Sequence, residues 1–224
     1  MQEVPVKAMS SSAAWPHRFV GGALCLDFIN SVDMPGTARE QDLFVDYAAI
    51  LRWSLARGSL TEAAHDRLAA KARRSAAAAE AVWRDALALR ADIRMLAHAL
   101  RSGDNPAPLI PRMNDKLSRL PLAPALRLRA AGAGTESGGN RVVFDLAGVD
   151  LEEPLWPVLW TTAALLVSDD TAKLGECQAS DCDAIFIDHT NNRSRIWCST
   201  ETCGNRERVR RAYQAKRAVK AAST

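Results

Sequence analysis

The stretch CQASDC at residues 177–182, followed fifteen residues later by CSTETCGNR at residues 198–206, decides how the C-terminal part of this chain folds. Four of the five cysteines lie here, as two pairs with the same spacing: Cys177 with Cys182, and Cys198 with Cys203. Two close thiol pairs joined by a hairpin-length segment are typical of a zinc site, because zinc takes four soft ligands in a tetrahedron. Two disulfides are the weaker alternative, since nothing else in the chain indicates secretion.

Four cysteines leave no coordination position for water, so we expect one zinc ion with a structural role and no catalytic role. Between the two pairs, residues 184–188 and 195–197 have the composition of two short strands, and residues 189–194 have that of a turn. After Cys203 the apolar residues Val209, Ala212 and Tyr213 recur at helical spacing. A knuckle, a hairpin and a helix that carries the last ligand in its first turn predict a treble-clef-like module.

The rest of the chain predicts a mostly α (α+β) protein, with a helical N-terminal domain and one β-hairpin. We expect Asp42 to cap a helix that ends at Gly58, and Thr61 to open a longer helical region with a break near Ser75 and an end at Gly103. The run at residues 21–31 fits a helix or a strand, and we favour the helix. Cys25 lies in this run and is predicted to be a core thiol.

The amino-acid composition then changes from helix-forming to strand-forming. Residues 126–130 and 141–146 read as the strands of a β-hairpin around a glycine-rich turn, and residues 151–168 return to helix, with Pro154 and Pro157 in its opening turns. The predicted organisation is a disordered N-terminus at residues 1–16, a helical domain at residues 17–172, and a zinc module with a basic helix at residues 173–224. We expect the helical domain to fold on its own.

Two stretches carry a resemblance to a known family. Residues 186–206, which read FIDHTNNRSRIWCSTETCGNR, resemble the CGNR zinc finger of bacterial proteins, and residues 22–31, GALCLDFINS, resemble the opening of the ABATE domain that precedes this finger. The resemblance implies that the four cysteines bind zinc and that the protein is a stress-induced transcription regulator. The chain departs from the family pattern after Cys182, where Asp183 and Ala184 replace a glycine and a large aromatic residue.

Charge is distributed unevenly along the chain. Residues 204–220 hold seven basic residues and one acidic residue, a net +6, whereas the whole chain has a net charge of +3, so the remainder is slightly acidic. Such a footprint favours nucleic-acid binding, with DNA ahead of RNA, because arginine forks bind phosphates and guanine edges. The candidate contact residues are Arg193, Arg195, Asn205, Arg206, Arg208, Arg210, Arg211, Lys216 and Arg217.

Other interpretations stay open at this point. Asn205 and Arg206 would alternatively tie the helix start to the hairpin through Asp188. The module would alternatively be an RNA-binding zinc ribbon, or a protein-interaction module that zinc merely stabilises. The N-terminal domain would sense a small molecule or form a homodimer. The sequence of this domain holds no catalytic motif, so we expect that the protein is not an enzyme. The chain shows no secretory signal and no apolar run of membrane length, so we expect a cytoplasmic protein without membrane contact.

Overall fold

The computed structural model describes residues 15, 18–33, 37–38, 40–120, 125–129, 141–145 and 150–222, with side chains given outside 125–129, 141–145 and 218–222. The predicted disordered N-terminus at residues 1–16 lies almost wholly outside these residues, as does the turn of the N-terminal domain's hairpin. The α-helices are α1 Leu24–Ile29, α2 Tyr47–Arg57, α3 Glu62–Arg74, α4 Ala76–Ser102, α5 Ile110–Leu117, α6 Trp156–Leu166 and α7 Asn205–Ala222. The short helical turns are η1 Ala107–Leu109, η2 Glu153–Leu155, η3 Asp169–Lys173 and η4 Thr200–Gly204.

Three antiparallel strand pairs complete the described structure. They are β1 Val32–Asp33 with β2 Gln41–Asp42, β3 Ala125–Arg129 with β4 Arg141–Asp145, and β5 Leu174–Glu176 with β6 Ile185–Ile187. The protein is therefore mostly helical, with small strand pairs and a C-terminal helix after the cysteine cluster, as the sequence predicts. The pairing of β3 with β4, which places Ala125 opposite Asp145, confirms the hairpin predicted in the N-terminal domain.

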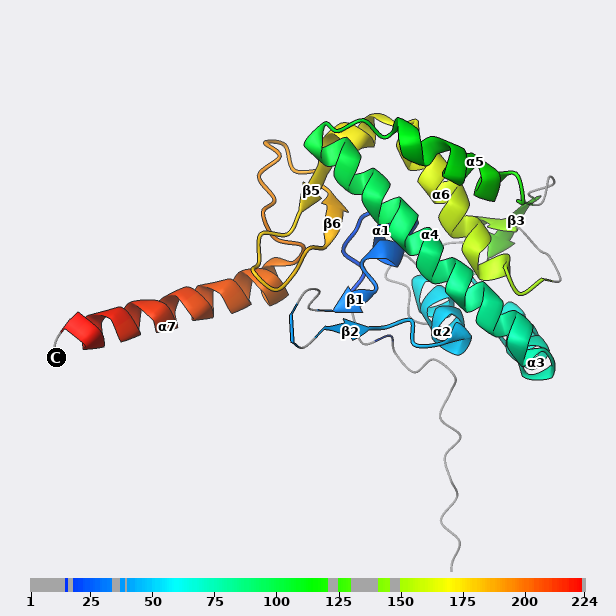
Figure 1. Ribbon diagram of the computed structural model, residues 1–224, viewed down its shortest axis with the longest axis horizontal. Coiled ribbons are helices and arrows are strands. Elements are labelled where there is room, and N and C mark those ends of the chain that lie inside the picture. Colours follow the sequence, from blue (N-terminus) through cyan, green and yellow to red (C-terminus); the bar gives the residue numbers. More distant parts are fainter. Residues whose placement is uncertain are drawn as a thin grey trace, which may run out of the picture.

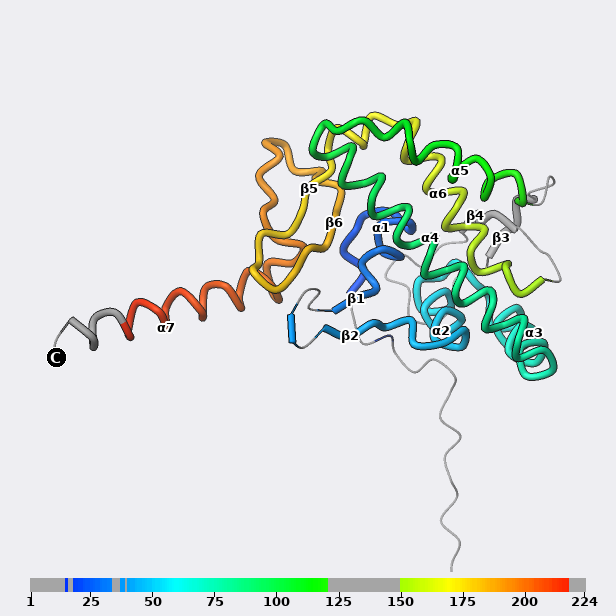
Figure 2. The backbone as a smooth tube through the Cα atoms, in the orientation of Figure 1, coloured from blue at the N-terminus to red at the C-terminus, as the bar shows by residue number. Residues whose placement is uncertain are grey.

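The short helix α1 lies in the middle of the molecule and contacts α4, α6 and β6 (Figures 1 and 2). The α-helix at Leu24–Ile29 confirms the helix favoured for this run, and its residues from Cys25 to Ile29 are all buried. Phe28 packs against Phe44 and Trp53, with ring centroids 5.2 and 5.5 Å apart. Burial raises the pKa of the Cys25 thiol to about 11, as expected of a core thiol.

Local signals place most helix ends correctly. Gly58 and Gly103 end α2 and α4 in the left-handed conformation, with φ of 78° and 76°, which glycine adopts without strain. Thr61 caps α3 by accepting a hydrogen bond from the amide of Ala64 at 3.1 Å, and Ser75 separates α3 from α4. These ends match the sequence-based expectation.

The prediction that Asp42 caps α2 is wrong. The cap is Asp46, whose carboxylate accepts the amide of Ala49 at 2.6 Å. Asp42 instead belongs to β2, where its carboxylate pairs with Arg90 of α4. Both aspartates precede the same apolar pattern, so the pattern alone does not decide between them.

The finger region and the helical body share one hydrophobic core. Ile185 and Ile187 of β6 are 0% and 4% exposed and belong to the same cluster as Phe28 and Trp53. The side chain of Asn30, at the end of α1, donates to the carbonyl of Ile185 at 2.8 Å and accepts its amide at 3.0 Å. A helical domain cut off at residue 172 would lose these contacts, and that it folds alone stays a prediction.

Two charged contacts reinforce this junction. Arg94 of α4 pairs with Asp183 at 2.7 Å and also donates to the carbonyl of Ile29 at 2.6 Å. Arg101, about two helical turns further along α4, pairs with Glu176 of β5 at 2.5 Å. Asp183 is one of the two residues at which the sequence analysis found a departure from the finger pattern, and here it holds the finger against α4.

Candidate metal centre and nucleic-acid interface

The four cysteines predicted as ligands come together in space. One ligand atom from each of Cys177, Cys182, Cys198 and Cys203 lies within 4.8 Å of all the others, and none of the four forms a disulfide. The Sγ atoms of Cys182 and Cys198 are 3.7 Å apart, and those of Cys198 and Cys203 are 3.4 Å apart. A tetrahedron with Zn–S bonds of about 2.3 Å has S···S edges of about 3.8 Å, so the thiols are spaced to hold a metal ion.

The backbone around the cysteines is fixed by its own hydrogen bonds. The amide of Cys177, just after β5, donates to the carbonyl of Ala184 at 2.9 Å, and the amide of Cys182 donates to Ala179 at 3.0 Å. These two bonds close the first ligand loop into a compact knuckle. Hydrogen bonds among the four thiols lower the pKa of Cys177 and raise the pKa of Cys182 and Cys198, so the first thiolate of the cluster forms at Cys177.

The second ligand pair lies at the entrance to α7. Ser199 accepts the amide of Thr202 at 3.2 Å and so caps the π-helical turn η4, which contains Cys203. Gly204 follows at a point of close approach, because a Cβ atom there would lie 2.9 Å from Cδ1 of Trp197. The glycine between Cys203 and Asn205 is therefore explained by packing against the indole.

The predicted hairpin of the module has a different partner strand. β6 does match the expected strand at residues 184–188, but it pairs with β5, with Leu174 opposite Ile187. Residues 195–197 form no strand; Ile196 instead accepts the amide of Gln178 at 3.0 Å. This bond ties residues 195–197 to the knuckle, and the two expected strands do not pair with each other, because β6 pairs with β5.

Arg195 is half-buried and makes several contacts within the protein. Its guanidinium lies 4.0 Å above the ring of Phe186 and donates to the carbonyls of Val20 at 2.9 Å, Trp197 at 3.1 Å and Cys198 at 2.5 Å. It therefore ties the finger to the segment that precedes α1. Arg193 also contacts the protein, through one bond of 3.1 Å to the carbonyl of Ala172, but its side chain is exposed.

Two of the predicted contact arginines are held by one aspartate. Asp181, in the knuckle, accepts from Arg206 at 2.7 Å and from Arg210 at 3.2 Å. Arg206 also donates to Sγ of Cys203 at 3.4 Å; burial lowers its pKa, but the negative charges of Cys203 and Asp181 outweigh burial and raise it. The structural role considered for Arg206 therefore runs through Asp181.

The partner expected for that role, Asp188, is occupied elsewhere. Its carboxylate accepts the hydroxyl of Thr190 at 2.7 Å, the amide of Thr190 at 2.8 Å and the amide of Arg195 at 2.9 Å. The bonds from Thr190 come first among the causes that lower the pKa of Asp188. Asp188 thus shapes the turn after β6, and no contact with the start of α7 occurs in the described structure.

The remaining candidates on α7 are exposed. Arg208 makes one bond of 3.3 Å, to the carbonyl of Gly204, and no acidic partner of Arg208 occurs among the described residues. Four further side chains are exposed and pair with no acid in the described part of the chain: Asn205, Arg211, Lys216 and Arg217. Glu207, the acid within α7, is 8% exposed and accepts the amide of Ser180 at 3.1 Å.

Sequence reasoning missed Asp181, Glu207, Asn30 and Arg94 as residues that build the site. Asp181 had a signal, because it is the acid inside the CQASDC knuckle and a basic helix follows the second cysteine pair. Asn30 had none, since its partner Ile185 lies 155 residues away.

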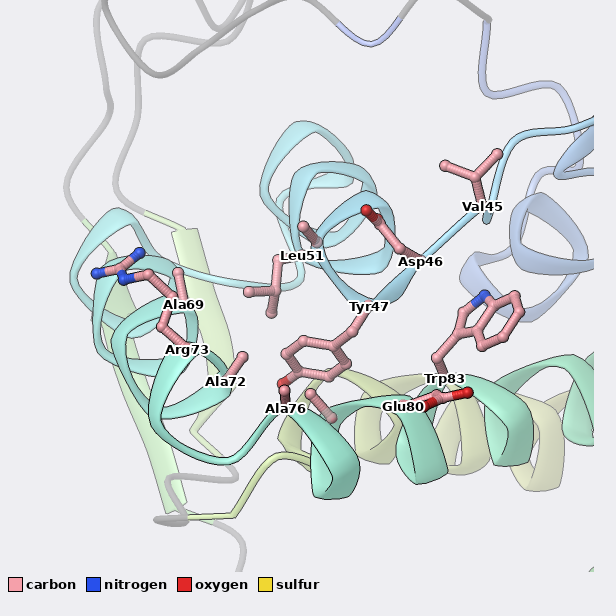
Figure 3. Close-up of a pocket in the computed structure, with 12 residues that line it drawn as sticks. Val45, Asp46, Tyr47, Leu51, Ala69, Ala72, Arg73, Ala76, Glu80 and Trp83 are labelled. Atoms are coloured by element: carbon pink, nitrogen blue, oxygen red, sulfur yellow. The ribbon is translucent and has the colours of Figure 1, made fainter.

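The helical body contains a pocket of its own. It has a volume of about 460 Å³ and lies between α2, α3 and α4 (Figure 3). The ring of Tyr47 and the indole of Trp83 form its walls. Small side chains such as Ala72 and Ala76 line the rest and leave the volume free, and Arg73 lies at the edge. Tyr47 is held in place by its hydroxyl, which donates to the carbonyl of Leu151 at 2.7 Å.

A helical body joined to a four-cysteine finger and a basic helix is the architecture of a metal-binding finger protein. Comparison with protein families assigns residues 22–169 to ABATE, described as "Putative stress-induced transcription regulator", and residues 173–217 to the CGNR zinc finger. The chain thus belongs to the ABATE family and carries a CGNR zinc finger behind that domain. A comparison with curated proteins gives no match. None of the helices that the structure describes has the length and apolar character of a membrane span.

Proposed function

We propose that the chain is a transcription regulator that binds duplex DNA through α7, and that one zinc ion held by Cys177, Cys182, Cys198 and Cys203 stabilises the finger at the base of this helix. The observation that carries the proposal is the position of α7. The helix leaves the finger and projects away from the rest of the molecule (Figure 1). A helix presented in this way can enter a DNA groove without interference from the body.

The electrostatics of α7 support DNA as the partner. Glu207 is turned into the finger, and together Asp181 and Glu207 balance the charges of the two arginines nearest the body: Arg206 pairs with Asp181, and Arg210 pairs with both acids. What remains on the projecting surface is basic: Arg208, Arg211, Lys216 and Arg217 are exposed. An isolated basic helix gains little from intrahelical ion pairs, whereas phosphates would neutralise it and release counterions.

The zinc role rests on the thiol geometry and on the family. We assign a structural, treble-clef-like finger, because the second ligand pair leads directly into a helix and all four positions of a tetrahedron are filled by sulfur. The protein would act in the cytoplasm, where thiols stay reduced, and by binding alone without catalysis.

The test is a salt titration of binding by the zinc-loaded full chain. We expect binding to random-sequence duplex DNA at 50 mM salt, and a fall in affinity whose log–log slope is about −0.9 for each phosphate contacted. Single-stranded RNA of the same length is the matched competitor. Failure to bind any duplex at low salt would remove DNA as the partner and leave RNA or a protein as the alternatives.

A second role concerns the body, where the 460 Å³ pocket supports sensing of a small apolar molecule. The fluorescent anion 8-anilinonaphthalene-1-sulfonate is a suitable probe, because it combines apolar rings with a charge complementary to Arg73. We expect it to bind the protein and to lose affinity in Ala72→Phe, which fills the pocket, but not in Ala78→Phe, on an exposed part of α4. Analytical ultracentrifugation of the same samples tests whether the body forms a homodimer.

A further inference from the structure

One face of α7 carries a different set of side chains from the rest of the helix. Asn205, Val209, Ala212 and Lys216 follow the spacing i, i+4, i+7 and i+11, which places them on one stripe of a helix with about 100° between residues. Val209 is 63% exposed, and Asn205, Ala212 and Lys216 are exposed as well. We call this stripe the reading face.

The finger itself sets the direction of the reading face. Arg206, Glu207 and Arg210 are bound to Asp181 and to the amide of Ser180, so they mark the side of α7 that is turned toward the knuckle. On a helical wheel these three residues occupy about 100° to 200° from Asn205, and the reading face is centred near 0°. The knuckle contacts therefore turn the reading face away from the protein.

Basic side chains lie on either side of the reading face. On the helical wheel Arg208 lies about 60° and Arg211 about 120° from Asn205 on one side, and Arg217 lies about 120° away on the other side, beyond the turns that contact the knuckle. This arrangement fits a duplex, because a helix in the major groove passes between two phosphate backbones. Arg208 bonds to the carbonyl of Gly204 only through Nε, so both terminal nitrogens of its guanidinium remain for a phosphate or a guanine edge.

We propose that the reading face enters the major groove of B-form DNA and reads A·T base pairs, with Asn205 on an adenine edge and Val209 and Ala212 against thymine methyl groups. The inference rests on the proposed DNA binding and deepens it. An asparagine amide matches N6 and N7 of adenine, and small apolar side chains contact the thymine methyl group. Between Asn205 and Ala212 the helix rises about 10.5 Å, which spans about three base pairs.

The partner is DNA and not duplex RNA for a geometrical reason. A B-form major groove about 12 Å wide admits an α-helix, whereas the A-form major groove is deep and narrow. A second copy of α7 is also a poor occupant, because two helices that both carry this excess of basic residues repel one another.

The experiment begins by selecting bound sites from a random duplex pool with the zinc-loaded full chain. We expect the enriched sites to share an adenine and neighbouring thymines, and Asn205→Ala to lower discrimination between selected and scrambled duplexes by about 5- to 150-fold. The matched control is Gln214→Ala, which removes an exposed amide about 180° around the helix and should leave discrimination unchanged. Zinc content and helical circular dichroism show that each variant is folded.

A second measurement removes only the methyl groups. Replacing the shared thymines by deoxyuridine should weaken binding about fourfold for each methyl that Val209 or Ala212 covers. Binding of all duplexes alike, unchanged discrimination in Asn205→Ala, or equal affinity for the same sequence as duplex RNA overturns this inference and leaves the proposed function standing. Absence of any DNA binding at 50 mM salt overturns the proposed function itself.

Discussion

The finger and the outer part of α7 use the same kind of side chain in opposite ways. In the finger, Arg195 lies on Phe186 and among backbone carbonyls, and Arg206 lies between Asp181 and Cys203. Further along α7, Arg211 and Arg217 are exposed and have no acidic partner in the described structure. An arginine-rich segment is thus not one surface: a single aspartate in the knuckle separates the arginines that orient the helix from those that can meet phosphate.

The largest effect should follow loss of a metal ligand. Cys198→Ser should abolish metal binding, because the remaining three thiols cannot close the tetrahedron, and the folding energy coupled to structural zinc is on the order of 10 kcal/mol in small fingers. The measurement is metal content together with the melting temperature. Cys25→Ala is the control: it also removes a buried thiol, yet should keep the metal. Full metal content in Cys198→Ser would contradict the assignment.

The next effect tests how firmly the finger belongs to the body. Ile185→Ala should lower the free energy of unfolding by roughly 2–5 kcal/mol, because it leaves a cavity in the common core. Ile196→Ala, in the same finger but 44% exposed, should cost about 0.5 kcal/mol or less. Both follow from denaturant unfolding monitored by tryptophan fluorescence. Equal costs for the two variants would show that the finger folds apart from the body.

A smaller effect should come from the knuckle aspartate. Asp181→Asn should cost about 1–2 kcal/mol, because the charge-assisted bonds to Arg206 and Arg210 weaken while the amide keeps the shape of the carboxylate. The control is Glu201→Gln, which removes an equally negative charge from an exposed pair with Arg18. Tighter DNA binding with unchanged stability would mean that Asp181 only masks charge and does not orient α7.

The smallest effect on stability should occur in the outer helix. The double change Arg211→Ala and Arg217→Ala should alter the free energy of unfolding by no more than about 0.5 kcal/mol, because both side chains are exposed. The log–log salt slope of DNA binding should nevertheless become shallower by up to about 2, one phosphate for each arginine. An unchanged slope would place the DNA contacts elsewhere on the chain.

Sequence reasoning succeeded where a signal is local. Gly58, Gly103 and Thr61 each mark a helix end through the conformation or the hydrogen bond of a single residue. The spacing of the four cysteines is enough to predict that they form one metal site. The mostly helical fold and the family follow from such signals. They depend little on what lies nearby in space.

It failed where the partner is remote or where two candidates are equivalent. The strand β6 was predicted, but its neighbour β5 was not, because the composition of residues 195–197 suits a strand equally well. For Arg206 three aspartates were available in the finger, Asp181, Asp183 and Asp188, and only the folded knuckle brings Asp181 within reach. The bond between Asn30 and Ile185 crosses 155 residues and leaves no trace in local patterning.

The same long separation affects the order in which the chain folds on the ribosome. At 5–20 residues per second, roughly 8 to 30 s pass between synthesis of Asn30 and of Ile185. Throughout that interval α1 has already been made while β6, which covers part of it, has not. We therefore expect the apolar side chains of α1 to remain accessible to chaperones until the finger emerges, so that the nascent chain depends on holding factors longer than a helical body of this size otherwise would.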